Sequence, residues 1–346
     1  MCNICKLANF PFQSLDKFEF KRCFYLNDIN DFNELLPDLL ASDFFQHDNN
    51  DNIDEGVPLD IKETKYFTAD GMHKKMVHDS NKFSLMHVNL NTLNDKYKMY
   101  HSNLCDLLNP MNGKFNIIAV SETRLNELSD LTNLSIPGYK PLSKEYCDFS
   151  PTCAGGVAVY IDENLDAFPR PDLKMGIPEC ENIWLEINQG SSNKNIIFGL
   201  VYRHPRKLAA DIDIFTQAFE LNLEKINHEG KLSFITGDVN LNLLNASGTG
   251  IPNYVNALFC NNHTKPTRIV PNKTPSLIDH MYSNALESEI ETGICLYPIS
   301  DGHLPIFAIA DIKPSYINRK IFVRNYKKFN TEEFNNHLRF NLADFD

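Results

Sequence analysis

The chain has 346 residues, of which 42% are hydrophobic and 23% are charged, and its formal net charge is −12. This length and composition suit one large globular domain with extensions, and the acidic balance argues against a large basic groove. No run of eighteen apolar residues occurs, and residues 1–13 lack the apolar stretch of a signal peptide, so we expect no membrane span and no secretion.

The cysteines are scattered along the chain, and the acidic residues are concentrated near its N-terminus. Nine cysteines are scattered along the chain, which suits reduced thiols in an intracellular protein of the nucleus or cytoplasm. Residues 1–80 carry 8 Lys and Arg against 15 Asp and Glu, whereas residues 81–346 have a net charge of only −5. Since a nuclease that gathers carboxylates around a cation can be acidic overall, net charge does not exclude DNA as a partner.

Residues 26–80 are acidic and poorly periodic, and we predict a partly disordered linker there. The stretch "QHDNNDNIDEG" (46–56) has almost nothing to bury. Residues 28–45 form either a short helix, a binding segment or a partly ordered tail.

Residues 81–313 are predicted to form one α/β domain. Apolar runs suited to buried strands occupy 83–90, 116–122, 156–161, 182–187, 196–203, 232–240, 276–283 and 304–312. Helical spacing of apolar residues predicts helices over 94–108 and 211–226. We therefore predict two mixed β-sheets packed face to face and flanked by helices, a four-layer α/β sandwich, after a poorly ordered acidic N-terminal extension.

Polar residues follow the apolar runs at the ends of several predicted strands. They are Asn89, Glu122, Tyr202, Asp238, Asn240, Asp279, Asp301 and His303. Strands that run in the same direction bring their ends to one edge, where sheet proteins usually place their sites. Each residue alone is explained as well by a solvated turn. Together they are the equipment of metal-assisted phosphodiester hydrolysis.

The chemistry suits these residue types. Mg²⁺ prefers oxygen ligands and keeps several waters, so one or two carboxylates hold it, and Mn²⁺ accepts the same donors. Asp238 and His303 are both candidates for the base that activates water. Asp279 on the far nitrogen of His303 would fix its tautomer. Asn240 and Tyr202 can bind phosphate oxygens without adding negative charge.

The ordered motifs resemble those of a known superfamily. The series "HVNLNTL", "SETRL", "GGVAVYI", "VYRHP", "GDVNLNLL", "TKPTRI", "SLIDHMYSN" and "SDGHLPIF" resembles the endonuclease/exonuclease/phosphatase superfamily. Within it the likeness is to the abasic-site-type endonuclease of LINE-class non-LTR retrotransposons, over about residues 83–312. The resemblance implies a two-sheet α/β sandwich and a metal-dependent endonuclease that nicks DNA.

The resemblance also implies a role for each site residue. The metal-associated residues would be Glu122, Asn89 and Asp301. The catalytic residues would be Tyr202 on the phosphate, Asp238 on the attacking water, Asn240 beside it, Asp279 orienting the histidine, and His303. Thr267 and Arg203 are expected to contact the substrate.

One residue departs from the family pattern. The family has Ser-Asp-His, whereas Gly302 separates Asp301 from His303 here. A strand that absorbed one extra residue rigidly would turn the next side chain to its other face. A glycine can instead form a bulge, because it tolerates positive φ. We expect the fold to survive, and leave open whether activity does.

Both ends of the chain fit the same resemblance. Residues 1–25, with Cys2 and Cys5, resemble the tail of a PHD-like zinc finger, and Cys23 is a further candidate ligand. A structural zinc needs about four ligands, so we expect no intact zinc site. Residues 314–346 resemble the start of a linker towards a reverse transcriptase. We thus expect a fragment of a mobile-element polyprotein, with two alternatives: a phosphoesterase acting on another substrate, or a non-catalytic remnant or DNA-binding module.

Overall fold

The computed structural model describes residues 64–93, 100–109, 114–140, 143–146, 155–178, 180–189, 194–205, 209–244, 260–261, 265–270, 273–297, 299–316 and 330–335. Two units divide at residue 316, close to the predicted boundary at 313. In the second unit, residues 331–335 are helical. The predicted zinc-finger remnant (1–25) and most of the predicted linker lie outside the described residues.

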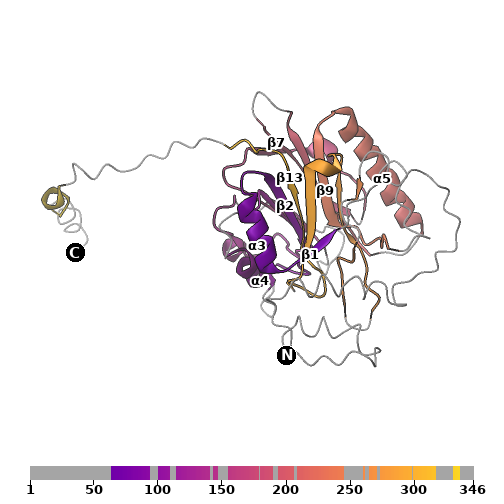
Figure 1. Ribbon diagram of the computed structural model, residues 1–346, viewed down its shortest axis with the longest axis horizontal. Helices are drawn as coiled ribbons and strands as arrows, with labels where there is room; N and C mark the ends of the chain where they lie inside the picture. The colour runs from indigo at the N-terminus through magenta and orange to yellow at the C-terminus, as the bar shows by residue number, and fades with distance from the viewer. Residues whose placement is uncertain are drawn as a thin grey trace. The chain divides into compact units, whose positions relative to one another are not determined.

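Among the described residues of the first unit, seven strands form one sheet, in the order β1-β12-β13-β2-β3-β5-β4 (Figure 1). The bounds are Lys65–Phe67 for β1, Phe83–Asn89 for β2, Ile117–Ser121 for β3, Ser143–Glu145 for β4, Val157–Ile161 for β5, Ile290–Cys295 for β12 and Ile306–Ala310 for β13. The sheet is mixed, because β1–β12 and β2–β3 are parallel pairs and the others are antiparallel.

Six described strands form the second sheet, in the order β10-β11-β9-β8-β7-β6. Their bounds are Ala167–Pro169 for β6, Cys180–Ile187 for β7, Ile196–Arg203 for β8, Leu232–Asp238 for β9, Cys260–Asn261 for β10 and Asp279–Ser283 for β11. Only β8 and β9 pair in parallel within this described sheet. Short 3-10 helices cover Thr132–Leu134, Pro171–Leu173 and Glu287–Glu289.

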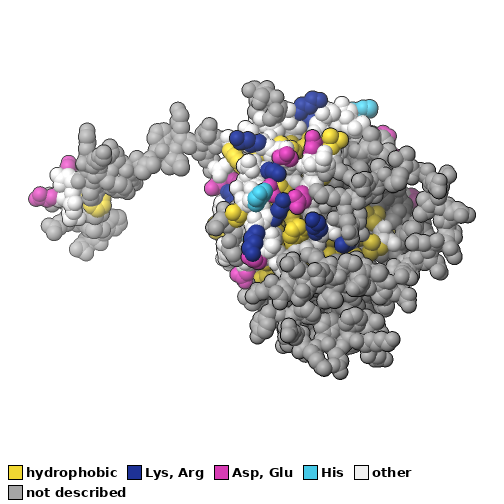
Figure 2. All heavy atoms as spheres, viewed as in Figure 1, with side chains coloured by type: hydrophobic (Ala, Val, Ile, Leu, Met, Phe, Trp, Pro, Cys, Tyr) yellow, Lys and Arg dark blue, Asp and Glu magenta, His cyan; other side chains and the backbone are white. Residues whose placement is uncertain are grey.

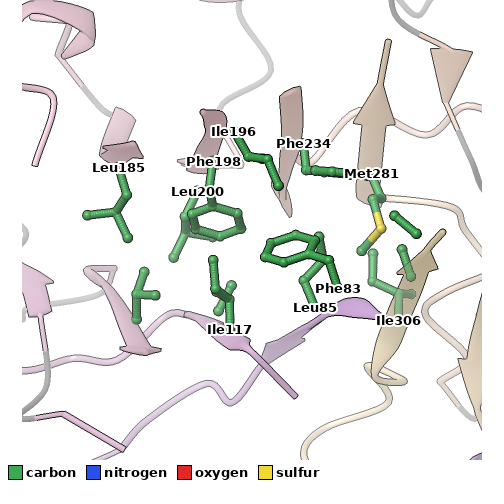
Figure 3. Close-up of a cluster of buried hydrophobic side chains, with 14 of the residues drawn as sticks. Phe83, Leu85, Ile117, Leu185, Ile196, Phe198, Leu200, Phe234, Met281 and Ile306 are labelled. Atoms are coloured by element: carbon green, nitrogen blue, oxygen red, sulfur yellow. The ribbon is translucent and has the colours of Figure 1, made fainter. Parts of the chain in front are cut away.

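The central core lies between the two sheets. Figure 3 shows side chains of Phe83, Leu85, Ile117 and Ile306 from the first sheet meeting Leu185, Ile196, Phe198, Leu200, Phe234 and Met281 from the second. These residues alternate along their strands with residues that face outward, as a two-sided sheet requires. Burying this surface is the main favourable contribution to the stability of the sandwich.

Helices cover the outer faces. The helices α3 (Ala69–His78) and α4 (Tyr100–Leu108) pack on the first sheet, and α5 (Ala209–His228) packs on the second, on the opposite side of the molecule (Figure 1). Figure 2 shows basic and acidic side chains interspersed on the face that carries α3. The predicted four-layer α/β sandwich of two mixed sheets is confirmed. Within the described residues, no helix has the length and apolar character to cross a membrane.

The eight predicted strands correspond to β2, β3, β5, β7, β8, β9, β11 and β13, and α4 and α5 match the predicted helices, residues 94–99 lying outside the described ones. The predicted start of the domain at residue 81 is too late. Tyr66 in β1 and Met72 and Met76 in α3 are buried, and β1 pairs with β12. A three-residue strand has too few positions to show alternation, so the sequence pattern missed it.

Candidate active site

Strand pairing brings the predicted site residues to one end of both sheets. In the first sheet, Asn89 at the end of β2 pairs with Ser121 at the end of β3, and Glu122 follows directly. In the second sheet, Asp238 at the end of β9 pairs with Asp279 at the start of antiparallel β11. The sequence therefore places carboxylates from two strands of one sheet opposite polar residues from two strands of the other.

Asn89 joins the two sheets at this end. Its Nδ2 donates to Glu122 Oε1 at 2.8 Å and to Asp238 Oδ2 at 2.8 Å. Glu122 has a φ of +53°, a left-handed backbone that a residue with a side chain rarely adopts. Such conformations persist where the surrounding structure enforces them, commonly at functional sites. The amide of Asn89 thus holds two carboxylates from different sheets within one hydrogen-bonded group.

Asp238 carries an unusual protonation equilibrium. Its carboxylate is 1% exposed. Burial first, and then the negative charge of Asp279, raise the pKa of Asp238 to about 7. A carboxyl group with this pKa can accept a proton near neutral pH, which is the requirement for a general base.

His303 and Asp279 form a buried pair. The imidazole Nδ1 lies 3.0 Å from Asp279 Oδ2 and 3.2 Å from Oδ1. Burial alone would lower the pKa of His303, but the charge and hydrogen bond of Asp279 outweigh it and raise the pKa. Burial would likewise raise the pKa of Asp279, but His303 lowers it. The pair therefore favours an imidazolium held by a carboxylate, with Nε2 as the second ring nitrogen.

Tyr202 supplies a phenol beside the carboxylates. It is buried near the end of β8 and forms a hydrogen bond with Glu122. Burial first, and then the negative charges of Glu122 and Asp238, raise the pKa of Tyr202 above its ordinary value. The phenol is therefore protonated across the physiological range and acts as a donor.

Asn240 and Arg203 support each other through the backbone. Asn240, with a φ of +53°, donates from Nδ2 to the carbonyl of Arg203 at 2.8 Å, and its backbone N–H donates to Asp238 Oδ1 at 2.9 Å. The guanidinium of Arg203, 4% exposed, donates to the carbonyls of Val239 and Asn240 at 2.8 and 2.9 Å. These buried contacts make Arg203 a support for the loop after β9, in contrast to the substrate contact predicted for it.

Thr267 is buried against Asp279. Its Oγ1 donates to Asp279 Oδ2 at 2.9 Å and accepts the backbone N–H of Asp279 at 3.0 Å. Thr267 is 0% exposed and its hydroxyl holds Asp279, whereas contact with the substrate was predicted for it.

Gly302 adopts the positive φ expected of an accommodated insertion, +87°. Its carbonyl accepts the N–H of Ile269 at 2.8 Å, and Leu304 N–H donates to Thr267 at 2.8 Å. A Cβ at Gly302 would lie 2.6 Å from the Ile269 carbonyl oxygen, so only glycine fits there. The left-handed residue lets His303 keep its contact with Asp279.

Asp301 is not gathered with the buried site residues. It is exposed, and its carboxylate accepts from Asn91 and Tyr100 at 2.6 and 2.5 Å. The prediction grouped Asp301 with the metal-associated residues Glu122 and Asn89, whereas its two carboxylate oxygens contact Asn91 and Tyr100. On either side of Gly302, Asp301 is exposed and His303 is buried.

Two supporting residues were missed by the sequence analysis. Asn91 follows Asn89 at a spacing of two, and its backbone N–H donates to Asn89 Oδ1 at 2.9 Å. His280, next to Asp279, places Nε2 2.9 Å from the Leu241 carbonyl and Nδ1 2.8 Å from the Tyr282 hydroxyl. The repeated Asn in "NLN" was a usable signal for Asn91, whereas nothing in the strand pattern distinguished His280.

The donor set fits a divalent cation that prefers oxygen. Glu122 and Asp238 present carboxylate oxygens to the same amide nitrogen, and carboxylate oxygens of Asp238 and Asp279 lie within 4.8 Å of one another. The His303 imidazolium lies in the same group but has no lone pair for an ion. The raised pKa of Asp238 reports an excess of buried negative charge that a cation would offset. Carboxylate oxygens with room for water are the ligands of Mg²⁺ and Mn²⁺.

Neither a protein-family model nor a curated protein matches the sequence. Solved structures match the fold. The AP endonuclease LMAP from Leishmania major has a TM-score of 0.53 and 13% identity, covering 67% of this chain and 88% of its own. The catalytic domain of Xenopus laevis APE2 has a TM-score of 0.51 and 15% identity, covering 68% and 94%.

The 3′-5′ exonuclease NExo from Neisseria meningitidis has a TM-score of 0.51 and 13% identity, covering 66% of this chain and 100% of its own. At such identities the likeness concerns the fold and not the activity. The chain thus has the α/β sandwich of these solved structures.

Proposed function

We propose that this chain is a Mg²⁺-dependent DNA endonuclease that nicks one strand, with Mn²⁺ as an alternative ion. One observation carries the proposal: Asn89 binds Glu122 and Asp238 at the end of the sheets where Asp279 holds His303. This convergence supplies a carboxylate for the ion, a base and a cationic acid in one place.

Each residue has a defined task in this proposal. An ion held by Glu122 would polarise the scissile phosphate and offset charge that develops in the transition state. Asp238, which shares the Asn89 amide with Glu122, accepts the proton of the attacking water. Tyr202 and the His303 imidazolium donate hydrogen bonds to phosphate oxygens. Asp279 and Thr267 keep His303 oriented.

The source and substrate are part of the same proposal. The order of motifs from "HVNLNTL" to "SDGHLPIF" supports an origin in a LINE-class non-LTR retrotransposon. The neighbours whose names include AP endonuclease and exonuclease support DNA as the partner. An intracellular enzyme of the nucleus or cytoplasm would meet that substrate. Within this proposal Gly302 is an accommodated insertion, because it retains His303 in the site.

The test is nicking of supercoiled plasmid in Mg²⁺ by four purified forms. The chain as given should nick, and Asp238→Asn should lose at least about 100-fold, the lower range for removal of a general base. Asp213→Asn, an exposed position on α5, is the matched control and should retain full activity. Deleting Gly302 should displace His303 and also cost about 100-fold for a shift of about 1 Å.

Other outcomes separate the alternatives. A folded chain that nicks nothing, alone or without Gly302, would identify a remnant or binding module. Nicking only after deletion of Gly302 would make the glycine a lesion. Hydrolysis of a small phosphoester with no effect on DNA would move the proposal to another substrate class.

A further inference from the structure

A second polar network is linked to the candidate active site through Asn89. It consists of Asn91, Tyr100, Arg124 and Asp301, which we call the rim clasp. These residues come from the loop after β2, from α4, from the loop after β3 and from the segment before Gly302. Four separate parts of the chain therefore meet in one set of side-chain contacts.

Asp301 is the centre of the rim clasp. Its Oδ2 accepts from Asn91 Nδ2 at 2.6 Å, and its Oδ1 accepts from the Tyr100 hydroxyl at 2.5 Å. Both distances are short, as expected when the acceptor is ionised. A carboxylate whose two oxygens already face protein donors is poorly placed to ligate an ion in the buried site.

Asn91 connects Asp301 to Asn89. Its backbone N–H donates to Asn89 Oδ1 at 2.9 Å, and its own Oδ1 accepts from Arg124 Nη2 at 2.6 Å. An amide side chain has one acceptor oxygen and one donor nitrogen. Fixing Oδ1 of Asn89 on one side aims its Nδ2 at Glu122 and Asp238 on the other.

The backbone of the clasp is held in conformations that need such support. Asn91 and Arg124 have φ values of +58° and +50°, and Gly302 has +87°. A left-handed backbone is strained at a residue with a side chain, and it persists only where the surrounding structure enforces it. Ser300 Oγ also donates to the Asn89 carbonyl at 2.5 Å, which ties the segment of Asp301 to β2.

We propose that Asp301 is a positioning residue: bridged to Tyr100 and Asn91, it orients the Asn89 amide toward Glu122 and Asp238 and does not itself ligate the metal ion. The inference rests on the proposed function for its catalytic meaning, but the contacts are testable without catalysis. It assigns roles to Tyr100 and Asn91, and it makes the Gly302 insertion the feature that lets Asp301 face outward.

The experiment is a double-mutant cycle on the full chain with Tyr100→Phe and Asp301→Asn. Each single variant should lower kcat for plasmid nicking about tenfold, the value of one hydrogen bond to a charged group, with little change in KM. The double variant should fall no further than about twofold below Asp301→Asn alone, because Asp301→Asn already weakens the one contact that Tyr100→Phe removes. Tyr316→Phe is the matched control and should keep wild-type kcat, because its hydroxyl bonds Asn116, at the opposite end of β3.

Two further readouts do not depend on nicking. Mn²⁺ affinity by titration calorimetry should fall by a similar factor in Asp301→Asn and Tyr100→Phe, because both loosen the support of Asn89, whereas loss of a charged ligand would weaken it far more in Asp301→Asn alone. Hydrogen exchange of the Asn89 side-chain amide, followed by NMR, should be slow in the wild type and Tyr316→Phe and faster in Tyr100→Phe and Asp301→Asn.

The outcomes are distinguishable. If the wild type nicks no DNA but Asn89 exchange responds as described, the proposed function fails and the clasp stands. If Asp301→Asn abolishes Mn²⁺ binding while Tyr100→Phe leaves Asn89 exchange and kcat unchanged, Asp301 is a metal ligand and the inference is overturned.

Discussion

At the residue scale, the buried carboxylate of Asp238 lowers the stability of the fold, and it is also the group proposed to act as the base. Its pKa rises from an ordinary value of 3.8 to about 7 in the fold. In the unfolded chain the Asp238 carboxyl group loses its proton at a lower pH than in the folded chain. Its ionisation therefore lowers the free energy of unfolding. This loss is absent below pH 3.8, grows as the pH rises and is complete above about pH 7. A group kept charged at such a cost is typical of a functional site.

Asp238→Asn should therefore stabilise the metal-free protein. We expect a gain of about 1–3 kcal/mol at pH 8, where the native carboxylate is charged, and almost none at pH 4. Urea unfolding with a chelator present, at both pH values, measures it. Asp213→Asn, exposed on α5, should change stability by less than about 0.5 kcal/mol at either pH. A loss of stability at pH 8 in Asp238→Asn would mean that the buried charge is well solvated.

Residue identities at strand ends were predictable, whereas their partners were not. Apolar runs ending in Asn89, Glu122 and Asp238 could be read along the chain, because a buried strand imposes its pattern locally. The contacts of Arg203 and Thr267 arise from loops that are far apart in sequence, and no local pattern reports them. Contact with the substrate was predicted for both residues, whereas Arg203 contacts the backbone carbonyl of Val239 and Thr267 contacts the carboxylate of Asp279.

At the element scale, β1 and α3 belong to the domain despite their place in an acidic stretch. Thr68 caps α3 by accepting the N–H of Gly71 at 3.1 Å, and Asp79 follows the helix. Burial would raise the pKa of Asp79, but Lys75, Lys82 and His78 together lower it to about 2. Lys75 also pairs with Glu291 of β12. Residues 64–80 contain only a short stretch of periodic apolar residues among many charged ones, so the sequence suggested a linker there.

Truncation tests this boundary. Removing residues 1–80 should destabilise the protein by at least about 3 kcal/mol more than removing residues 1–63, because it uncovers the sheet beneath Met72 and Met76 and the edge of β12. Urea unfolding of the two shortened chains compares them directly. Asp79→Asn in the chain that lacks only residues 1–63 measures how much the ion pairs of Asp79 contribute to the free energy of unfolding. This contribution should disappear as the pH falls from 4 to 2. If the two shortened chains are equally stable, residues 64–80 are part of the linker and not of the domain.

At the scale of the whole molecule, the site depends on how the two sheets are joined. Glu181 of β7 accepts from His204, after β8, at 2.9 Å, and from the Gly156 N–H at 3.4 Å. Gly155 and Gly156 precede β5 of the other sheet, and their carbonyls accept the N–H groups of Arg124 and Thr123 at 2.8 and 3.1 Å. The left-handed backbone at Glu122 is thus fixed from the opposite sheet.

Glu181→Ala should loosen this junction. It leaves the buried His204 and the Gly156 N–H without their carboxylate, so we expect a loss of about 2–4 kcal/mol in the free energy of unfolding. Glu145→Ala removes an exposed ion pair with Lys174 and should cost less than about 1 kcal/mol. Urea unfolding compares the two. If both cost the same small amount, the contacts of Glu181 do not hold this junction together. The geometry of Glu122 is then maintained by β3, its own loop and Asn89.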